Sequence, residues 1–284
     1  MRIIRPPSEM QLAADEARRD GARISFVPTM GFLHEGHLSL MREARLRAAI
    51  LAVSIFVNPA QFGPGEDFTR YPRDLTRDCA LMEQIPVDIV FAPEPSAMYP
   101  ARAQTWVEVT ELTQGLCGRF RPGHFRGVTT IVAKLFNIVK PAYAIFGEKD
   151  FQQLRAIQRM VNDLNFDVEI VPMPIVREKD GLAISSRNAY LSPSERISAL
   201  SLSRALFAAR DRFNAGLDDP GELVKIAAGI IAQTPGVDAE YLEAADADTL
   251  GPIEEKNRPI LLALAALVGH TRLIDNIVLR PAAG

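Results

Sequence analysis

The chain has 284 residues, 48% of them hydrophobic, which suits one large domain or two unequal ones with an apolar core. Its 32 Lys and Arg against 35 Asp and Glu give a formal net charge of -3, which argues against nucleic acid or an anionic membrane as the main partner. No apolar run approaches the roughly 20 residues of a membrane-spanning helix, and the N-terminus is too short and polar for a signal peptide. Its two separated cysteines form neither a disulfide framework nor a paired metal motif, so we expect a cytoplasmic protein.

The first clear strand-to-helix turn carries two histidines. Residues 23–27 are an apolar, β-prone run, and a helical pattern begins near His37. Between them, Gly31 and Gly36 allow the backbone to bend and to approach a ligand closely. The free N–H groups and positive dipole end of the helix favour an anion, and the imidazoles of His34 and His37 can donate hydrogen bonds to phosphate oxygens. The turn therefore indicates a phosphate-handling site.

Other interpretations of the two histidines stay open at this point. A His-x-x-His pair can bind zinc, although the chain has only four histidines and no third ligand stands out. The histidines can also be surface or capping residues. Two glycines before a helix match neither the Walker pattern nor the three-glycine dinucleotide fingerprint. The role of the histidines therefore has to be inferred from the elements around them.

The second predicted strand, residues 49–57, is a continuous apolar run that is typical of a strand buried on both faces of a parallel sheet. A Pro/Gly-rich loop over residues 58–67 follows at the carboxyl end of that strand, where open α/β sheets place their ligands. Asn58 and Gln61 are therefore expected to face the same crevice as the histidines. The alternative, that Asn58 only caps a turn, stays open.

The middle of the chain continues the alternation. The pattern predicts a helix over residues 74–84, a short strand over 87–91 and a half-exposed strand over 105–109. A further strand over 142–146 and a helix over 151–164 follow. Strands and helices that alternate at this spacing favour an α/β fold.

A basic cluster precedes a helix predicted over about residues 128–139. It consists of Arg119, Arg121, His124 and Arg126. Such a cluster suits an anion site, a subunit contact or only a solvated loop, and the sequence alone does not choose among them.

The turn after residues 142–146 resembles the histidine turn, because it also lies between a predicted strand and a helix and carries groups that can bind phosphate. Lys149 can supply a point charge to a phosphate, and Asp150 can accept from a hydroxyl or cap the next helix. Gln153, one turn into that helix, is expected to point back toward the same crevice. The tripeptide Ser185 to Arg187 adds two hydroxyls and a guanidinium that suits bidentate contact with phosphate.

The composition changes after the loop around Ser185. Ala/Leu-rich helical stretches follow, with two strand-like runs over residues 237–243 and 258–268. We therefore predict two domains, residues 1–188 and 189–284. The predicted fold class is α/β: a Rossmann-like parallel sheet with helices on both faces, plus a smaller α+β C-terminal domain that acts as a lid.

Six segments, taken together and in order, resemble the pantothenate synthetase family. They are PTMGFLHEGH (28–37), FVNPAQFG (56–63), RPGHFRG (121–127), FGEKDFQQ (146–153), SSRN (185–188) and TRLIDNI (271–277). The first histidine pair is also similar to the His-x-Gly-His signature of the nucleotidylyltransferase superfamily, and residues 184–187 resemble its mobile second signature, which is normally richer in lysine.

The resemblance implies a reaction and its partners. Family members condense pantoate with β-alanine in an ATP-dependent reaction, through a pantoyl adenylate, and release AMP and pyrophosphate. It implies ATP as a substrate, Mg²⁺ held mostly by phosphate oxygens and water, a homodimer, and a lid over residues 61–71. Positions near Arg77 and Leu81, where relatives can carry metal ligands, hold none here, so no protein metal ligand is assigned. The alternative is another small-molecule adenylyl- or cytidylyltransferase of the same fold.

The resemblance also assigns roles to individual residues. The implied catalytic residues are His37, His34, Lys149 and Arg187. The implied ATP contacts are Met30, Gly31, Phe32, Leu33, His34, Glu35, Gly36, His37, Gly147, Glu148, Lys149, Asp150, Val176, Ile184, Ser185, Ser186 and Arg187. The implied pantoate contacts are Gln61, Gln153, Asn58 and Met30.

Overall fold

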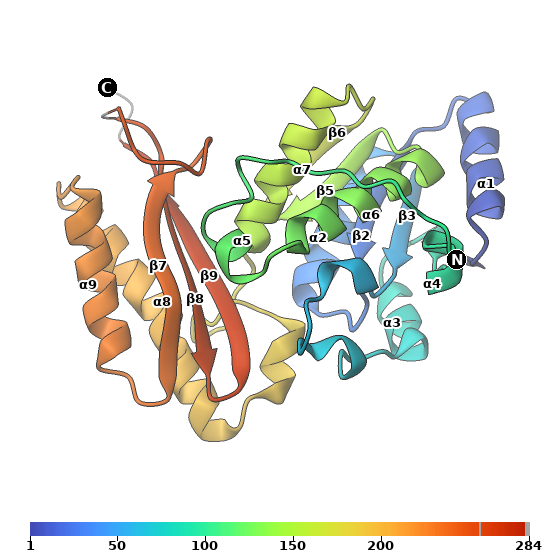
Figure 1. Cartoon of the computed structure of the whole chain (residues 1–284). Coiled ribbons are helices and arrows are strands. Elements are labelled where there is room, and N and C mark those ends of the chain that lie inside the picture. Colours follow the sequence, from blue (N-terminus) through green and yellow to red (C-terminus); the bar gives the residue numbers. More distant parts are fainter. Residues whose placement is uncertain (256, 282–284) are drawn as a thin grey trace. The chain divides into compact units, whose positions relative to one another are not determined.

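The computed structural model describes residues 1–255 and 257–281, and the chain in it forms two compact units (Figure 1). The first unit comprises Met1–Thr110, Arg121–Glu148 and Gln153–Pro174. The second comprises Glu111–Phe120, Lys149–Gln152 and Ile175–Gly284. The domain boundary expected between residues 188 and 189 falls inside the second unit and stays a prediction.

The first unit is built on a six-stranded sheet in the order β1-β4-β3-β2-β5-β6, and every neighbouring pair is parallel. Its strands are β1 (Arg2–Ile4), β2 (Ile24–Thr29), β3 (Ile50–Ile55), β4 (Ile89–Phe91), β5 (Tyr143–Gly147) and β6 (Glu169–Met173). Apolar runs such as that of β3 lie in the interior of the sheet, where both faces are covered. The predicted parallel sheet is confirmed.

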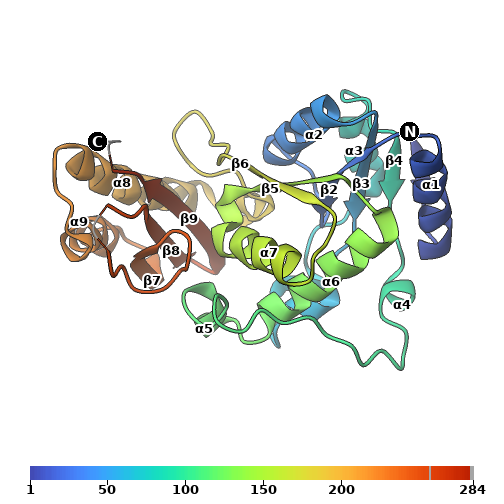
Figure 2. The ribbon, with the colours of Figure 1, turned by 90° about the horizontal axis from the view of Figure 1, so that it is seen from above.

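Helices cover the two faces of this sheet. They are α1 (Pro7–Arg19), α2 (Glu35–Arg47), α3 (Leu75–Met82), α4 (Pro95–Met98), α6 (His124–Val139) and α7 (Phe151–Asp163), with the short 3₁₀ turns η1 (Pro59–Gln61) and η2 (Asp67–Thr69). Leu38 and Met41 of α2 pack on alternate residues of the strands, among them Val27 and Val53. Figure 2 shows α6 on the opposite side of the sheet from α2. Because α6 is apolar around most of its circumference, nearly its whole length is buried.

The strand order places two turns at one point of the sheet. From β2 the chain builds outward through β3 and β4 on one side and through β5 and β6 on the other, so the order reverses between β2 and β5. Ligands of open α/β sheets bind outside the carboxyl ends of the strands at such a reversal. The histidine turn follows β2 there, and η3 (Glu148–Asp150) follows β5.

The second unit contains a three-stranded antiparallel sheet in the order β7-β8-β9. Its elements are α5 (Cys117–Phe120), η4 (Ser186–Tyr190), α8 (Pro193–Asn214), α9 (Pro220–Ala232), β7 (Val237–Asp246), β8 (Ile260–Val268) and β9 (Thr271–Leu279). Helix α8 begins with a capping box in which Ser192 and Glu195 satisfy each other's backbone N–H groups.

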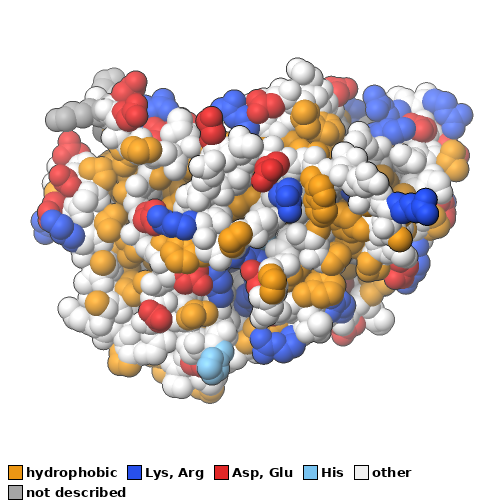
Figure 3. Space-filling view, viewed as in Figure 1, with side chains coloured by type: hydrophobic (Ala, Val, Ile, Leu, Met, Phe, Trp, Pro, Cys, Tyr) orange, Lys and Arg blue, Asp and Glu red, His pale blue; other side chains and the backbone are white. Residues whose placement is uncertain are grey.

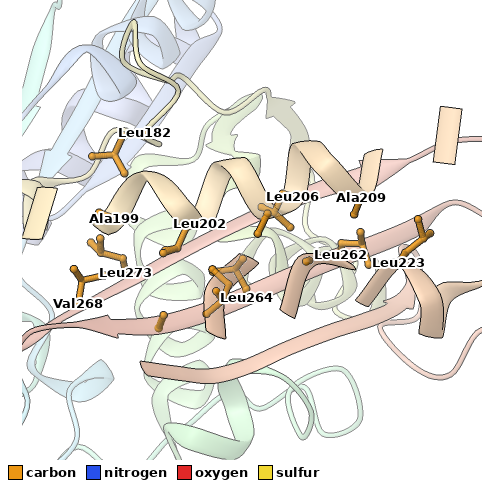
Figure 4. Close-up of a cluster of buried hydrophobic side chains, with 14 of the residues drawn as sticks. Leu182, Ala199, Leu202, Leu206, Ala209, Leu223, Leu262, Leu264, Val268 and Leu273 are labelled. Carbon is orange, nitrogen blue, oxygen red and sulfur yellow. The ribbon is translucent and has the colours of Figure 1, made fainter. Parts of the chain in front are cut away.

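Leucines join the helices to the sheet in the core of this unit. Leu202 and Leu206 of α8 face Leu262 and Leu264 of β8 (Figure 4), and all four are at most 1% exposed. Each leucine buried in this way contributes about 2 kcal/mol of hydrophobic stabilisation. The smaller C-terminal α+β architecture is therefore confirmed.

Some predicted elements differ from the structure. Residues 105–109 form no strand, because the backbone of Val107 bonds instead to threonine side chains of α6: its N–H donates to Thr130 Oγ1, and its carbonyl accepts from Thr129 Oγ1. The helix expected from about residue 128 begins already at His124.

The distribution of charged side chains on the surface agrees with the nearly balanced charge of the chain, and the apolarity of the helices shows whether any of them could cross a membrane. On the face drawn in Figure 3, basic and acidic side chains are interspersed. Within the part of the chain that the structure describes, no helix combines the length and the apolarity that crossing a membrane requires.

Candidate active site

The turn between β2 and α2 is held by side chains that accept its backbone N–H groups. The N–H of Gly31 donates to Thr29 Oγ1 at 3.2 Å, and those of Phe32 and Leu33 donate to Asp78 Oδ2 and Oδ1 at 2.8 and 2.7 Å. Gly31 and Phe32 both have positive φ angles, 82° and 50°, so the chain bends sharply before the helix. These three N–H donors of the turn therefore bond to the protein itself.

Asp78 of α3 is the anchor of this turn. Its side chain is only 1% exposed, and Arg77 Nη1 lies 3.3 Å from its Oδ1 while the Arg77 guanidinium covers the ring of Phe32. Burial raises the pKa of the Asp78 carboxyl above its ordinary value, although the N–H groups of Leu33 and Phe32 act to lower it. Sequence analysis missed Asp78, because its bonding partners lie 45 and 46 positions away in the chain.

The two histidines stand at the start of α2. The helix begins at Glu35, earlier than the predicted start near His37, so His34 is the N-cap residue. The rings of His34 and His37 stack with their centroids 4.0 Å apart. A Cβ atom on Gly36 would lie 3.0 Å from the His34 ring, so glycine leaves the room that this ring occupies.

The tautomer of His37 follows from its hydrogen bond. His37 Nδ1 accepts the backbone N–H of His34 at 3.3 Å. Because a backbone N–H only donates, the neutral ring carries its proton on Nε2. His37 therefore has an Nε2–H group that can donate to an anionic oxygen.

Asn58 and Gln61 form a network whose orientation is fixed step by step. Asn58 Oδ1 accepts the backbone N–H of Ala60 at 3.3 Å and the hydroxyl of Tyr99 at 2.8 Å. Asn58 Nδ2 consequently faces Gln61 Oε1, to which it donates at 3.1 Å. Gln61 Nε2 is left to donate to the sulfur of Met30 at 3.1 Å. A thioether is a weak acceptor, so a ligand oxygen can replace it readily.

Asn58 therefore combines a capping role with a contact to Gln61, two roles that the sequence alone did not distinguish. It caps η1, and its side chain orients Gln61. Tyr99, which the sequence analysis did not single out, supports it: burial raises the pKa of the Tyr99 hydroxyl to about 12, so the hydroxyl stays protonated and donates.

Gly147, the last residue of β5, and Glu148, the first residue of the turn, are both half-buried. Lys149 Nζ lies 3.9 Å from Asp150 Oδ2, and the side chain of Lys149 is 21% exposed. Gln153 follows as the third residue of α7 and is half-buried. The charged turn that the sequence predicts thus directly follows β5, at the carboxyl edge of the sheet.

In the second unit, the residues predicted to bind phosphate lie at the end of a small hairpin. Ile184 donates its N–H to the carbonyl of Val176 at 3.0 Å. Ser185 then caps η4 by accepting the N–H of Arg187 at 3.2 Å, and Ser186 is buried. The structure brings these residues together with one another, and it brings Met30, Asn58 and Gln61 together in the first unit.

Possible metal ligands do not gather in the described ranges. In residues 1–255 and 257–281, no three His, Cys, Asp or Glu side chains lie close enough to hold a metal ion.

Comparison with known proteins places this fold and this turn in one family. The family model described as pantoate-beta-alanine ligase matches residues 2–278. The chain belongs to the pantoate-beta-alanine ligase family. It is therefore an enzyme, of the ligase class.

Relatives match over essentially their whole length. A pantothenate synthetase of Geobacter sulfurreducens is 58% identical over 279 residues, 98% of this chain and 99% of the relative. A pantothenate synthetase structure from Thermus thermophilus has a TM-score of 0.94 at 45% identity and covers 99% of this chain and 100% of that one. The pantoate-beta-alanine ligase of Francisella tularensis, solved in complex with "Beta-gamma ATP" and β-alanine, has a TM-score of 0.80 at 31% identity, over 98% of this chain and 97% of that one.

Proposed function

We propose that this enzyme joins pantoate to β-alanine to form pantothenate, at the expense of ATP, through a pantoyl adenylate and with release of AMP and pyrophosphate. The observation that carries the proposal is the pair His34 and His37, stacked at the start of α2 where the strand order reverses, in a chain that matches the ligase family along its length. The ATP complex of the Francisella relative supports ATP as the co-substrate.

The first half-reaction forms the adenylate. A carboxylate oxygen of pantoate attacks the α-phosphorus of MgATP, and the bond to the bridging oxygen breaks so that pyrophosphate leaves with the electron pair. Two anions have to be brought together, so the protein mainly aligns them and offsets their repulsion. Mg²⁺ held by the phosphate oxygens of the nucleotide would neutralise part of their charge.

The chain offers several donors for this step. We assign His37 Nε2–H and the imidazole of His34 to the ATP phosphates, because His37 already holds its proton on that nitrogen. Lys149 and Arg187 supply fixed positive charge, and Ser185 and Ser186 supply hydroxyl donors. The nucleoside is assigned to the backbone around Gly147, Val176 and Ile184.

Pantoate is assigned to the amide of Gln61, with Gln153 as the second glutamine. The Gln61 amide is fixed by Asn58 and now rests against Met30, so a pantoate oxygen would exchange a weak acceptor for a strong one. The side chain of Met30 then lies beside the substrate as an apolar contact. This assignment explains why an asparagine, a glutamine and a methionine converge at one point.

The second half-reaction consumes the adenylate. The neutral amine of β-alanine attacks the acyl carbon, the bond from that carbon to the phosphate oxygen breaks, AMP leaves, and the nitrogen loses a proton. The mixed anhydride is already activated, so no strong base is required. Excluding water matters more, and the predicted lid over residues 61–71 serves this purpose.

Analysis of the nucleotide products tests the proposal. The enzyme is incubated with MgATP, and pantoate and β-alanine are added separately and together. We expect AMP and pyrophosphate to accumulate only with both, and pantoate alone to support exchange of labelled pyrophosphate into ATP. ADP as the product would overturn the adenylate pathway. Continued pyrophosphate release without any use of the amine would instead favour a nucleotidyltransferase of the same fold.

The role of His37 has a test of its own. We expect His37→Ala to keep the fold and to lose adenylate formation by about 100-fold or more. His37→Asn is the sharper variant, because its side-chain oxygen can still accept the N–H of His34 while the Nε2–H donor is lost. Circular dichroism checks the fold. Wild-type exchange rates in either variant would contradict the role.

We also propose a homodimer, on the ground of the family resemblance. Sedimentation equilibrium at micromolar concentration checks it, and a mass of one chain would contradict it.

A further inference from the structure

Two members of the basic cluster, Arg121 and His124, contact the segment that carries Gln61. Arg121 donates from Nη2 to the backbone carbonyl of Gln61 at 3.2 Å. It also forms a bidentate pair with Glu66, from Nε to Oε1 at 2.8 Å and from Nη2 to Oε2 at 2.5 Å. The Arg121 side chain is only 14% exposed, so this pair is shielded from solvent more than a surface ion pair.

His124 completes the contact. Its Nδ1 lies 2.8 Å from the carbonyl oxygen of Gln61, and its Nε2 lies 3.2 Å from Arg121 Nη1. A carbonyl only accepts and a guanidinium only donates, so Nδ1 carries the proton and Nε2 accepts. The Gln61 carbonyl therefore accepts two hydrogen bonds, one from Arg121 and one from His124.

The same segment also packs closely against the backbone of helix α6 at Gly127. A Cβ atom at Gly127 would lie 2.2 Å from the carbonyl oxygen of Ala60, so only glycine fits there. Asn58 Nδ2 donates to the carbonyl of Gly127 at 3.1 Å. The start of α6 thus holds both the backbone of η1 and, through Asn58, the amide of Gln61.

We infer that Arg121 and His124 are positioning residues that clamp the backbone of Gln61 and so pre-organise its amide for pantoate. The inference rests on the proposed function, in which Gln61 binds that substrate. A clamp of this kind lowers the cost of ordering the segment when the substrate binds. Glu66 serves as the counter-charge: partial burial acts to raise the pKa of its carboxyl, but Arg121 holds it below the ordinary value.

Kinetics of Arg121→Met test the clamp. We expect the KM for pantoate to rise about tenfold and the KM for ATP to change less than twofold, because Arg121 contacts Gln61 and Glu66 and neither is assigned to ATP. Arg126→Met is the matched control, since Arg126 belongs to the same cluster but is exposed and lies over the ring of Trp106. We expect both constants of the control to match wild type. An equal rise in both KM values, or none in Arg121→Met, would overturn the inference.

A pair of variants at His124 separates the hydrogen bond from simple packing. His124→Asn keeps an N–H donor near the place of Nδ1, and His124→Leu has a similar size without a donor. We expect the KM for pantoate to rise more in His124→Leu than in His124→Asn. Equal values would contradict the role of the hydrogen bond.

Amide hydrogen exchange over residues 58–66 gives a readout that does not depend on turnover. We expect exchange in Arg121→Met to be about tenfold faster than in wild type and Arg126→Met, since the clamp adds local stability. Unchanged exchange in Arg121→Met would refute the clamp even in an active enzyme. If wild type forms no pantothenate, the proposed function fails by itself, and the exchange comparison still decides whether the clamp exists.

Discussion

Two buried aspartates, one in each unit, perform the same local task with opposite consequences. Asp78 accepts the backbone N–H groups of Phe32 and Leu33, and Asp246 accepts those of Asp248 and Thr249. Asp246 bonds to residues two and three positions ahead and holds its own turn. Asp78 reaches across 45 and 46 positions and holds the turn that leads into the histidines.

The pKa values of the two carboxyls show the difference. The hydrogen bond from Arg258 is the largest of the causes that hold the pKa of Asp246 far below its ordinary value, with the N–H groups of Thr249 and Asp248 adding to it. For Asp78, burial outweighs its donors and raises the pKa. Asp246 therefore stabilises its unit, whereas Asp78 is kept at a cost in electrostatic energy. The comparison teaches that a carboxylate whose charge the fold disfavours marks a turn as a candidate functional site.

The largest effect is expected from Asp78→Asn. The amide keeps the size of the carboxyl but turns an NH₂ group toward one of the two N–H donors, so the histidine turn shifts. We expect kcat/KM to fall about 100-fold, as small displacements of catalytic groups do. The free energy of unfolding should change by less than about 1 kcal/mol, because weaker hydrogen bonds are offset by removal of a buried charge. A wild-type rate would show that Asp78 does not position the turn.

Asp246→Asn should lower the stability and leave the activity nearly unchanged. Its side chain is 6% exposed and loses charge-assisted hydrogen bonds with Arg258, so we expect about 2 kcal/mol less stability in urea denaturation. We expect kcat to stay within twofold of wild type. A large loss of activity in this variant would remove the contrast between the two aspartates.

Gly31→Ala tests the role of Asp78 from the residue of the turn that lies against its carboxyl, and Gly21→Ala is the matched control. Both Gly31 (φ 82°) and Gly21 (φ 74°) have positive φ, but a Cβ at Gly31 would lie 3.0 Å from Asp78 Oδ2 and one at Gly21 would meet nothing within 4 Å. Both alanine variants should lose about 1 kcal/mol of stability from backbone strain. Only Gly31→Ala should lose activity, about tenfold, because only there does the new methyl press on the anchor. Equal activities would contradict this.

The smallest effect is expected in the pH dependence of stability. The lowered pKa of Asp246 makes its contribution complete above the unfolded value of about 3.9, and the contribution is lost as the pH falls toward the folded pKa. The raised pKa of Asp78 has the opposite sign: its contribution is present below about pH 3.9 and is lost as the pH rises through the folded pKa. The stability advantage of wild type over Asp246→Asn should therefore shrink from pH 7 to pH 3. The free energy of unfolding of wild type, relative to that of Asp78→Asn, should fall as the pH rises. If the difference in unfolding free energy between wild type and either variant did not change with pH, the predicted direction for that aspartate would be contradicted.

The sequence predicts much of the fold, because β3 and β8 are apolar runs of the kind that form buried strands. It does not predict that residues 105–109 stay irregular. Their alternating pattern suits an edge strand, and only the threonines of α6 provide a better set of hydrogen-bond partners.

The sequence predicts the residues of the candidate site better than it predicts the residues that hold them in place. His34, His37, Asn58 and Gln61 stand out because strand ends and turns place them, and the structure brings Asn58 and Gln61 into contact. Their supports come from distant segments that carry no local signal. Asp78 is one acidic residue on an ordinary amphipathic helix, and its two acceptor bonds exist only after α3 has packed beside the turn.

Strand β8 also bears on how the chain is made. Its nine residues, 260–268, contain no charge and no proline, which is the composition of segments that assemble into amyloid. In the folded unit, β7 and β9 pair with both of its edges, so the segment has no edge open to another chain. Since β9 is synthesised after β8, β8 leaves the ribosome with one edge unpaired, and a chain that stops before Thr271 is expected to aggregate. Pairing with β9 thus protects this edge of β8 from misassembly in the newly made protein.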